Sequence, residues 1–396
     1  MSQIAPRRRR TAAPDLSQSA DTATGRQANL PPQSAPAPAA VETQVVYFCE
    51  ADVAAGLEEV ALAELRRVLG GNARSLQMTR TGVVSFEYTG DITRLLRPRT
   101  VLAIYFLQRF AVPRPKALLG DANFRRIMQM IATIRTLSPD DAYQTLYLSA
   151  AGSDSSVMNR LKEEIGKQAG LKVVSPNGHE GDLHLRVRRT PGSGSGWEVL
   201  ARITPRPLGA RPWRVRNMEG ALNATVASAM VRLTKPETGD RFLNIACGSG
   251  TLLIERAVSG PSTRLLGCDL STDALDAARE NVAAAGYAGR IELRQEDART
   301  LDLPDGSIDV ICADLPFGNL VGSHDGNLTL YPALLAEAAR VARPEARFVL
   351  ITHEVRLMET LLEESDLWKL EETKKVVLGG LHPRIFVLRR NGPAEQ

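Results

Sequence analysis

The sequence predicts an α/β protein whose C-terminal part is a doubly wound parallel sheet. In that part, strand-like and helical runs alternate regularly, which indicates parallel strands joined by crossover helices. Ahead of it, shorter strands and helices form a small α+β pattern without strict alternation. A chain of 396 residues, 43% of them hydrophobic, is long enough for two or three domains.

Composition and spacing exclude several other classes of protein. No stretch approaches the roughly 20 consecutive apolar residues of a membrane span, and no apolar segment of a secretory signal follows the N-terminal arginines. The four cysteines form no C-x-x-C pair and the five histidines have no ligand-like spacing to them. We therefore expect a cytoplasmic protein with no membrane association and no metal. The sequence does not determine the oligomeric state, for which we expect a monomer.

The first 42 residues predict a disordered arm. They contain the run Arg7–Arg10 and continue in Ser, Ala, Thr, Gln and Pro. Such a composition cannot bury enough apolar surface to fold on its own.

Residues 43–145 predict a first small α+β domain. A strand over 45–49 precedes a helix over 57–69, in which apolar residues return to one face before Gly70 and Gly71 end it. Further strands are predicted over 83–88 and 102–112, and a further helix over 124–134.

A second α+β domain is predicted over 146–205. Its first strand ends at Ala151, and a Gly/Ser turn at 192–196 joins its last two strands as a hairpin. A helix predicted over 155–169, between the first strand and this hairpin, carries basic side chains suited to phosphate contact. The candidate RNA-binding residues on this helix are Arg160, Lys162 and Lys167.

A basic linker, residues 206–220, leads into the last domain. Its arginines Arg211, Arg214 and Arg216 surround Trp213, a combination that suits phosphate contact with base stacking. Residues 43–220 contain 25 basic and 17 acidic residues, whereas residues 221–396 contain 19 and 25. This division predicts that the middle of the chain meets a polyanion.

The last domain, residues 221–391, contains the regular alternation. Helical runs are predicted over 252–258, 273–285 and 330–341, and 319–327 is predicted as a mobile loop. Strands are predicted over 241–246, 264–269, 290–296, 308–313 and 347–352. In such sheets, ligands bind beyond the carboxyl ends of the strands, where the strand order reverses.

Three strand ends together predict an adenosine site. The first strand runs into a glycine turn, but Leu253 stands where a dinucleotide fingerprint needs a third glycine. Asp269, at the end of the second strand, can accept hydrogen bonds from both ribose hydroxyls, and Asp297, at the end of the third, can accept one from an adenine amine. The predicted cofactor-binding residues are Asn244, Ala246, Cys247, Gly248, Ser249, Gly250, Thr251, Asp269, Leu270, Asp297 and Ala298.

The fourth strand ends in Asp-Leu-Pro-Phe-Gly, residues 314–318. With Ala-Cys-Gly-Ser-Gly-Thr-Leu-Leu-Ile-Glu at 246–255, this motif resembles the amino-methylating S-adenosylmethionine-dependent methyltransferases. The chain is more narrowly similar to the THUMP-containing RNA guanine-N2 methyltransferases, whose tRNA branch methylates guanosine 6. Phe48-Cys49-Glu50 and the linker around Arg206-Pro207-Leu208 extend the similarity beyond the catalytic motifs.

The resemblance implies a class I, Rossmann-like methyltransferase domain behind ferredoxin-like and THUMP-like regions. It implies S-adenosylmethionine as cofactor and RNA, above all tRNA, as partner. The family commonly has Asp-Pro where this chain has Asn244-Ile245, and often two prolines where it has Leu315-Pro316. Asn244 lacks the charge that would attract the cationic methionine portion of the cofactor.

The predicted catalytic residues are Asp314, Leu315, Pro316 and Phe317. Asp314 and the Leu315 carbonyl can accept both hydrogens of an exocyclic amine and so turn its lone pair toward the methyl donor. Pro316 stiffens the turn, and Phe317 stacks on the extruded base. Two alternatives remain open: adenine-N6 methylation of DNA or RNA, and RNA binding by a methyltransferase domain that no longer turns over.

Overall fold

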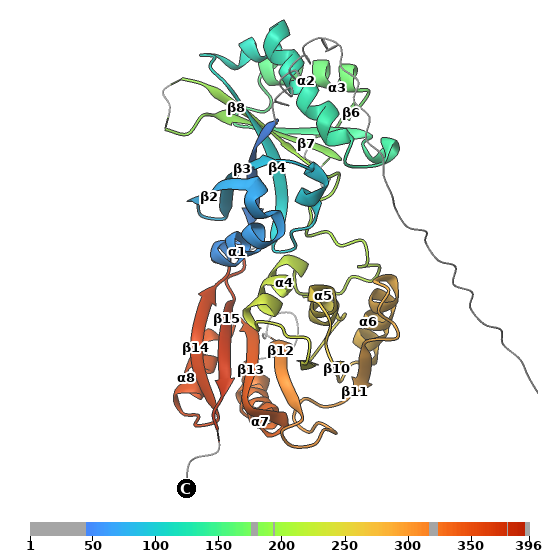
Figure 1. Cartoon of the computed structure of the whole chain (residues 1–396), viewed down its shortest axis with the longest axis vertical. Coiled ribbons are helices and arrows are strands. Elements are labelled where there is room, and N and C mark those ends of the chain that lie inside the picture. Colours follow the sequence, from blue (N-terminus) through green and yellow to red (C-terminus); the bar gives the residue numbers. More distant parts are fainter. Residues whose placement is uncertain (1–44, 176–180, 193–194, 317–323, 378, 393–396) are drawn as a thin grey trace, which may run out of the picture. The chain divides into compact units, whose positions relative to one another are not determined.

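A computed structural model of the chain describes residues 45–175, 181–192, 195–316, 324–377 and 379–392 (Figure 1). The predicted arm, residues 1–42, and the predicted stacking residue Phe317 lie outside these described residues. No helix within the described ranges has the length and apolar character that crossing a bilayer requires.

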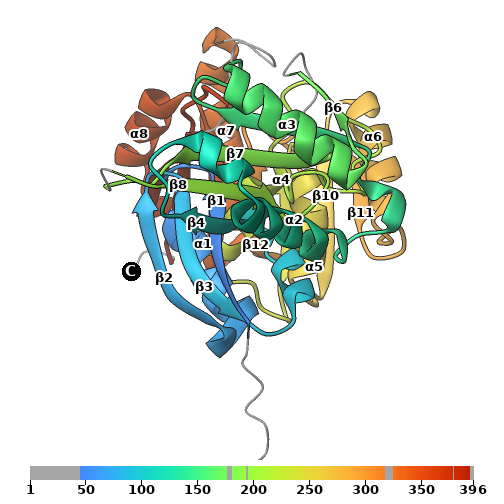
Figure 2. The same cartoon turned by 90° about the horizontal axis from the view of Figure 1, so that it is seen from above.

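The N-terminal part is a mixed sheet with helices packed on one face (Figure 2). Its strand order is β2-β3-β1-β4-β8-β7-β5-β6. The elements are β1 (Val46–Val53), α1 (Glu58–Leu69), β2 (Ala73–Arg80), β3 (Val83–Thr89), β4 (Val101–Phe110), α2 (Asp121–Arg135), β5 (Thr145–Ala150), α3 (Ser156–Ala169), β6 (Lys172–Val173), β7 (Leu183–Arg189) and β8 (Trp197–Arg202).

The predicted border at residues 145 and 146 does not divide this sheet. Strand β8, from the second predicted domain, pairs antiparallel with β4, from the first, and Phe106 lies opposite Ala201. A strand edge left unpaired would expose a row of unsatisfied backbone groups, and this pairing removes two such edges. The two predicted domains therefore share one sheet.

The C-terminal part confirms the predicted doubly wound sheet. Its strand order is β11-β10-β9-β12-β13-β15-β14, with β9 to β13 parallel. The elements are α4 (Ala224–Leu233), β9 (Arg241–Ile245), α5 (Thr251–Ser259), β10 (Arg264–Asp269), α6 (Thr272–Ala284), β11 (Glu292–Gln295), β12 (Ile308–Asp314), α7 (His324–Val341), β13 (Ala342–Thr352), α8 (Val355–Glu363), β14 (Trp368–Lys375) and β15 (Arg384–Arg390).

The strand order reverses between β9 and β12. From β9 the chain runs outward through β10 to β11 and then returns to place β12 on the other side of β9. Ala313 lies opposite Ile245, so these two buried strands end at the same edge of the sheet. This edge is where the topology opens a crevice for a ligand.

The loop predicted over 319–327 is wrong in its last part. Residues 317–323 lie outside the described residues, but α7 begins at His324 and includes Asn327. Asn327 is buried and hydrogen-bonded, so this polar stretch is the first turn of a packed helix.

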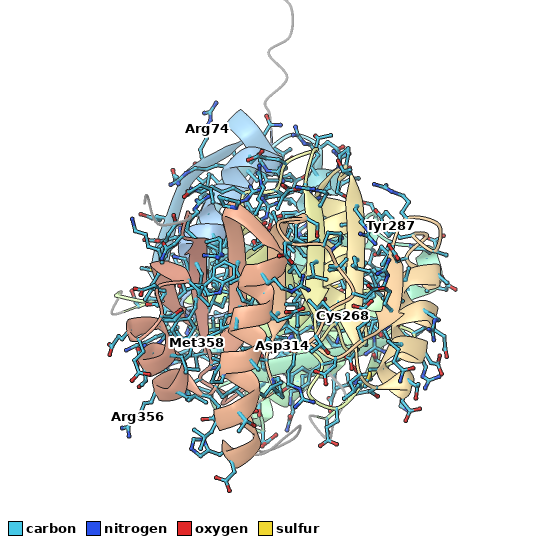
Figure 3. The ribbon with its side chains drawn as sticks, turned by 90° about the horizontal axis from the view of Figure 1, so that it is seen from below. Arg74, Cys268, Tyr287, Asp314, Arg356 and Met358 are labelled. Carbon is cyan, nitrogen blue, oxygen red and sulfur yellow. The ribbon has the colours of Figure 1, made fainter. Side chains whose placement is uncertain are left out.

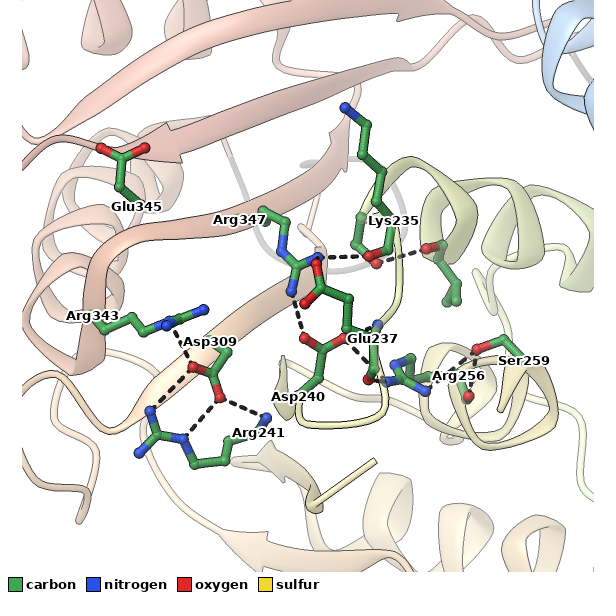
Figure 4. Close-up of polar contacts among 12 residues, drawn as sticks. Lys235, Glu237, Asp240, Arg241, Arg256, Ser259, Asp309, Arg343, Glu345 and Arg347 are labelled. Carbon is green, nitrogen blue, oxygen red and sulfur yellow. Dashed lines mark hydrogen bonds and ion pairs between the residues drawn. The ribbon is translucent and has the colours of Figure 1, made fainter. Parts of the chain in front are cut away.

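The opposite edge of this sheet carries a network of ion pairs (Figure 4). Asp240, just before β9, pairs with Arg256 and Arg347, while Asp309 in β12 pairs with Arg241. These charges lie at the amino ends of the strands, away from the crevice. We therefore assign them to holding helix α5 and the strands in register.

Two buried glutamates join the N-terminal sheet to the C-terminal part. Glu64 on α1 pairs with Arg232 on α4, and Glu255 on α5 pairs with both Arg99 and Arg211. Each glutamate is 1% exposed. Removing one arginine would leave a buried carboxylate short of a partner, which is costly in proteins.

We expect Gly56→Ala to destabilise the protein more than Gly70→Ala. Both glycines have positive φ, so each alanine costs about 1–3 kcal/mol in backbone strain. A Cβ at Gly56 would lie 1.7 Å from the Lys375 carbonyl oxygen, whereas one at Gly70 meets no atom within 4 Å. Urea unfolding should show a loss of about 3 kcal/mol or more at Gly56. Equal losses in the two variants would contradict this close approach.

Candidate functional site

A pocket of about 880 Å³ opens at the carboxyl ends of β9, β10, β11 and β12. It lies where the topology predicts a ligand site. Figure 3 marks Asp314 and Cys268, two of the side chains that line it. Of the predicted cofactor residues, the walls include Ala246, Cys247, Gly248, Ser249, Thr251, Asp269, Leu270, Asp297 and Ala298.

Two of the predicted cofactor residues do not line the pocket. Asn244 is 1% exposed, and its Nδ2 donates to the Cys312 carbonyl at 3.1 Å, so it ties β9 to β12. A Cβ at Gly250 would lie 3.3 Å from the Cβ of Ala278, so this glycine allows α5 to pack close to α6. Because Asn244 does not line the pocket, its lack of a negative charge does not change the charge of the pocket wall.

The two predicted adenosine carboxylates lie at separate points of the pocket. Asp269 accepts hydrogen bonds from the backbone of Gly248 at 2.9 Å and of Ser271 at 3.0 Å, which fixes its carboxylate at the end of β10. Asp297 is held by Arg299, whose hydrogen bonds lower the pKa of that carboxyl. Both groups can accept hydrogen bonds, as ribose hydroxyls and an adenine amine require.

Asp314 and Leu315 bring a carboxylate and a backbone carbonyl to the end of β12. Both residues line the pocket, and no donor in the described part of the chain reaches the Asp314 carboxylate or the Leu315 carbonyl. Burial raises the pKa of the Asp314 carboxyl to about 7. Asp314 is half-buried in the pocket wall, and a carboxyl held there without a partner among the described residues is a frequent mark of function, because it costs stability.

The structure assigns the linker a role that the sequence did not indicate. Residues 218–222 line the pocket, so this segment is part of the pocket wall. Arg214 holds it there by donating to the Leu222 carbonyl at 2.8 Å and to the Thr251 hydroxyl at 2.9 Å. Both partners of Arg214 lie beside the pocket, whereas the arginine-rich composition of the linker indicated only contact with RNA.

Arg211 and Trp213 do not fit the predicted RNA contact. The Arg211 side chain is 5% exposed and pairs with Glu255, and Trp213 is buried in the apolar core. Arg216 is exposed and forms a surface pair with Glu280 at 2.7 Å. Of the basic residues on α3, Arg160 and Lys167 are exposed, whereas Lys162 is half-buried and donates to the Ser153 carbonyl.

Comparisons with known proteins point to one family. A family model described as "RMKL-like, methyltransferase domain" matches residues 211–384. The chain is 32% identical over 230 residues to the tRNA (guanine(6)-N2)-methyltransferase of Thermus thermophilus, a match covering 57% of this chain and 68% of that protein. The crystal structure of TrmN from Thermus thermophilus superposes with a TM-score of 0.68 and 26% identity, over 87% of this chain and 99% of that one.

A relative from Bos taurus, tRNA (guanine(6)-N(2))-methyltransferase THUMP3, is 33% identical over 182 residues. That match covers 43% of this chain and 36% of the relative. The chain thus spans about a third of the length of this longer relative.

We expect Asp314→Asn to stabilise the protein at high pH only. The folded pKa lies above the unfolded value of about 4, so the native state binds its proton more tightly and Asp314 costs stability as pH rises from about 4 to 7. Asparagine removes this cost. The unfolding free energy of the variant should match that of the parent near pH 4 and exceed it by about 2–4 kcal/mol at pH 8. A difference independent of pH would contradict the assignment.

Proposed function

The chain belongs to the family of THUMP-containing RNA guanine-N2 methyltransferases, and on this premise we propose that it methylates the exocyclic N2 amine of a guanosine in structured RNA. The relatives from Thermus thermophilus and Bos taurus are named for guanine 6 of tRNA, and we propose tRNA as the substrate here. The observation that carries the proposal is the pair of acceptors in the pocket wall, Asp314 and the Leu315 carbonyl, to which no group among the described residues donates.

The pocket fits S-adenosylmethionine by the chemistry of its walls. Asp269 would hold the ribose hydroxyls, Asp297 the adenine amine, and the exposed side chain of Leu270 one face of the adenine ring. Carboxylates along the pocket suit a ligand that carries two cationic groups. When bound, this cofactor supplies an electrophilic methyl group on a sulfonium.

The residues at the end of β12 would activate the target amine. A guanine N2 amine is a poor nucleophile, because its lone pair is delocalised into the ring. Asp314 and the Leu315 carbonyl would accept its two hydrogens and turn the lone pair toward the methyl group. Once the nitrogen has gained the methyl group it is cationic, and the Asp314 carboxylate would take the proton that it loses.

RNA binding is proposed for the N-terminal part, including residues 146–205, and for the exposed Arg216. Extruding the target base costs a few kcal/mol, which contacts to the RNA backbone must offset. Arg160 and Lys167 are exposed on α3 and are the candidates that the structure leaves accessible.

Methyl transfer to total tRNA, followed by nucleoside analysis, tests the proposed function. We expect N2-methylguanosine as the product and a loss of about 10³-fold or more in kcat for Asp314→Asn, because the amide no longer accepts the proton. A methylated base other than N2-methylguanosine would overturn the substrate assignment. An Asp314→Asn variant with full activity would overturn the mechanism.

The pH dependence of the reaction gives a second test. The amine must meet an ionised Asp314, whose pKa in the free enzyme is about 7. We expect kcat/KM to rise about tenfold per pH unit below pH 7 and to level off above it. A flat profile between pH 5.5 and 8 would show that this carboxyl does not have to ionise.

Arg214 and Arg216 should separate cofactor binding from RNA binding. Arg214 holds the pocket wall, so Arg214→Ala should weaken S-adenosylmethionine binding by about 5- to 20-fold, equivalent to about 1–2 kcal/mol. Arg216→Ala, a matched change two residues away, should instead raise the KM for tRNA and leave cofactor affinity within about twofold. Calorimetry with the cofactor and steady-state kinetics with tRNA measure the two effects. The reverse pattern would contradict the assignment of Arg214.

A further inference from the structure

The Leu315 carbonyl needs support on both sides if it is to aim at an amine. On its N-terminal side, the Leu315 amide donates to the Ile351 carbonyl at 3.0 Å, which ties it to β13. On its C-terminal side stands Pro316, which has no N–H to donate to any neighbouring strand. Support on that side must therefore come from the Pro316 carbonyl.

Two side chains of α7 donate to the Pro316 carbonyl. The Tyr331 hydroxyl lies 2.7 Å from it and the Asn327 Nδ2 lies 3.1 Å from it. Tyr331 is 0% exposed and Asn327 1% exposed, so water does not compete for these bonds. Because one carbonyl oxygen offers two lone pairs, this pair of donors saturates it.

The Tyr331 hydroxyl is itself held in place. It lies 2.7 Å from the Thr352 hydroxyl, at the end of β13, and Thr352 also accepts from the Glu354 amide at 2.9 Å. Burial raises the pKa of Tyr331 well above its usual range, so the phenol keeps its proton and remains a donor. Helix α7 and strand β13 thus fix both ends of the Leu315–Pro316 dipeptide.

We infer that Tyr331 and Asn327 are positioning residues that bind the Pro316 carbonyl and thereby leave the Leu315 carbonyl free and aimed at the target amine. This inference rests on the proposed function. It differs from a purely structural role in its consequence, because misaiming one acceptor slows transfer without changing how tightly cofactor or RNA binds.

Tyr331→Phe tests the inference, with Tyr88→Phe as a matched control. Tyr88 is also 0% exposed, and its hydroxyl also donates to a backbone carbonyl, that of Asp91, at 2.7 Å. Both variants should lose similar thermal stability. Tyr331→Phe should lower kcat by about tenfold, with the KM for tRNA and the Kd for S-adenosylmethionine within about twofold of the parent, and Tyr88→Phe should keep kcat within about twofold.

Asn327→Ala is a second variant, which removes the other donor to the Pro316 carbonyl. It should also lower kcat by about tenfold at unchanged KM, and the double variant with Tyr331→Phe should lose more than either single change. Single variants that both keep the parent kcat would overturn the inference, as would a Tyr331→Phe loss matched by Tyr88→Phe. A parent protein that transfers no methyl group to tRNA would overturn the proposed function instead.

Discussion

The site depends on two hydrogen-bond acceptors at the end of a buried strand, Asp314 and the Leu315 carbonyl, to which no group in the described ranges donates. Burying a polar group without a partner costs about 1–3 kcal/mol, and a carboxylate costs more. The structure accommodates this cost by saturating the neighbouring groups: the Leu315 amide donates to β13, and the Pro316 carbonyl receives two donors from α7. The raised pKa of Asp314 has the same cause, because desolvation disfavours the charged carboxylate.

The linker and the buried Glu255 connect the pocket to the N-terminal part of the chain. Glu255 lies on the helix that follows the glycine turn, and it pairs with Arg99 of the N-terminal part and Arg211 of the linker. Arg214 then ties the linker to Thr251, at the start of that helix. The proposed RNA-binding part and the pocket are therefore connected through α5 by ion pairs and hydrogen bonds.

The sequence predicted best those elements whose residues are buried along their whole length. Strand β12 was predicted over 308–313 and is observed at Ile308–Asp314, because a strand buried on both faces is mostly apolar, here Val310 to Ala313 after Asp309. Strand β14, at Trp368–Lys375, was missed because it is mostly exposed and charged. Asp269, the last residue of β10, and Asp297, just after β11, both line the pocket, because parallel strands end at one edge.

The errors arose where a residue's partner lies far away in the sequence. Arg211 was predicted to contact RNA, but its partner Glu255 comes 44 residues later and becomes a neighbour only in the folded chain. Asn244 was predicted to contact the cofactor, but its side chain turns toward Cys312 on the adjacent strand. Residue type and spacing indicate the chemistry of a segment, whereas the face it presents is decided by long-range packing.

The arrangement of the two acceptors can be measured in a crystal structure with S-adenosylhomocysteine and an RNA carrying the target guanosine. We expect the guanine N2 at about 2.7–3.2 Å from both an Asp314 carboxylate oxygen and the Leu315 carbonyl oxygen. The Pro316 carbonyl should remain bonded to Tyr331 and Asn327 in that complex. A guanine whose N2 contacts neither acceptor, or a Leu315 carbonyl turned away from the pocket, would contradict this arrangement.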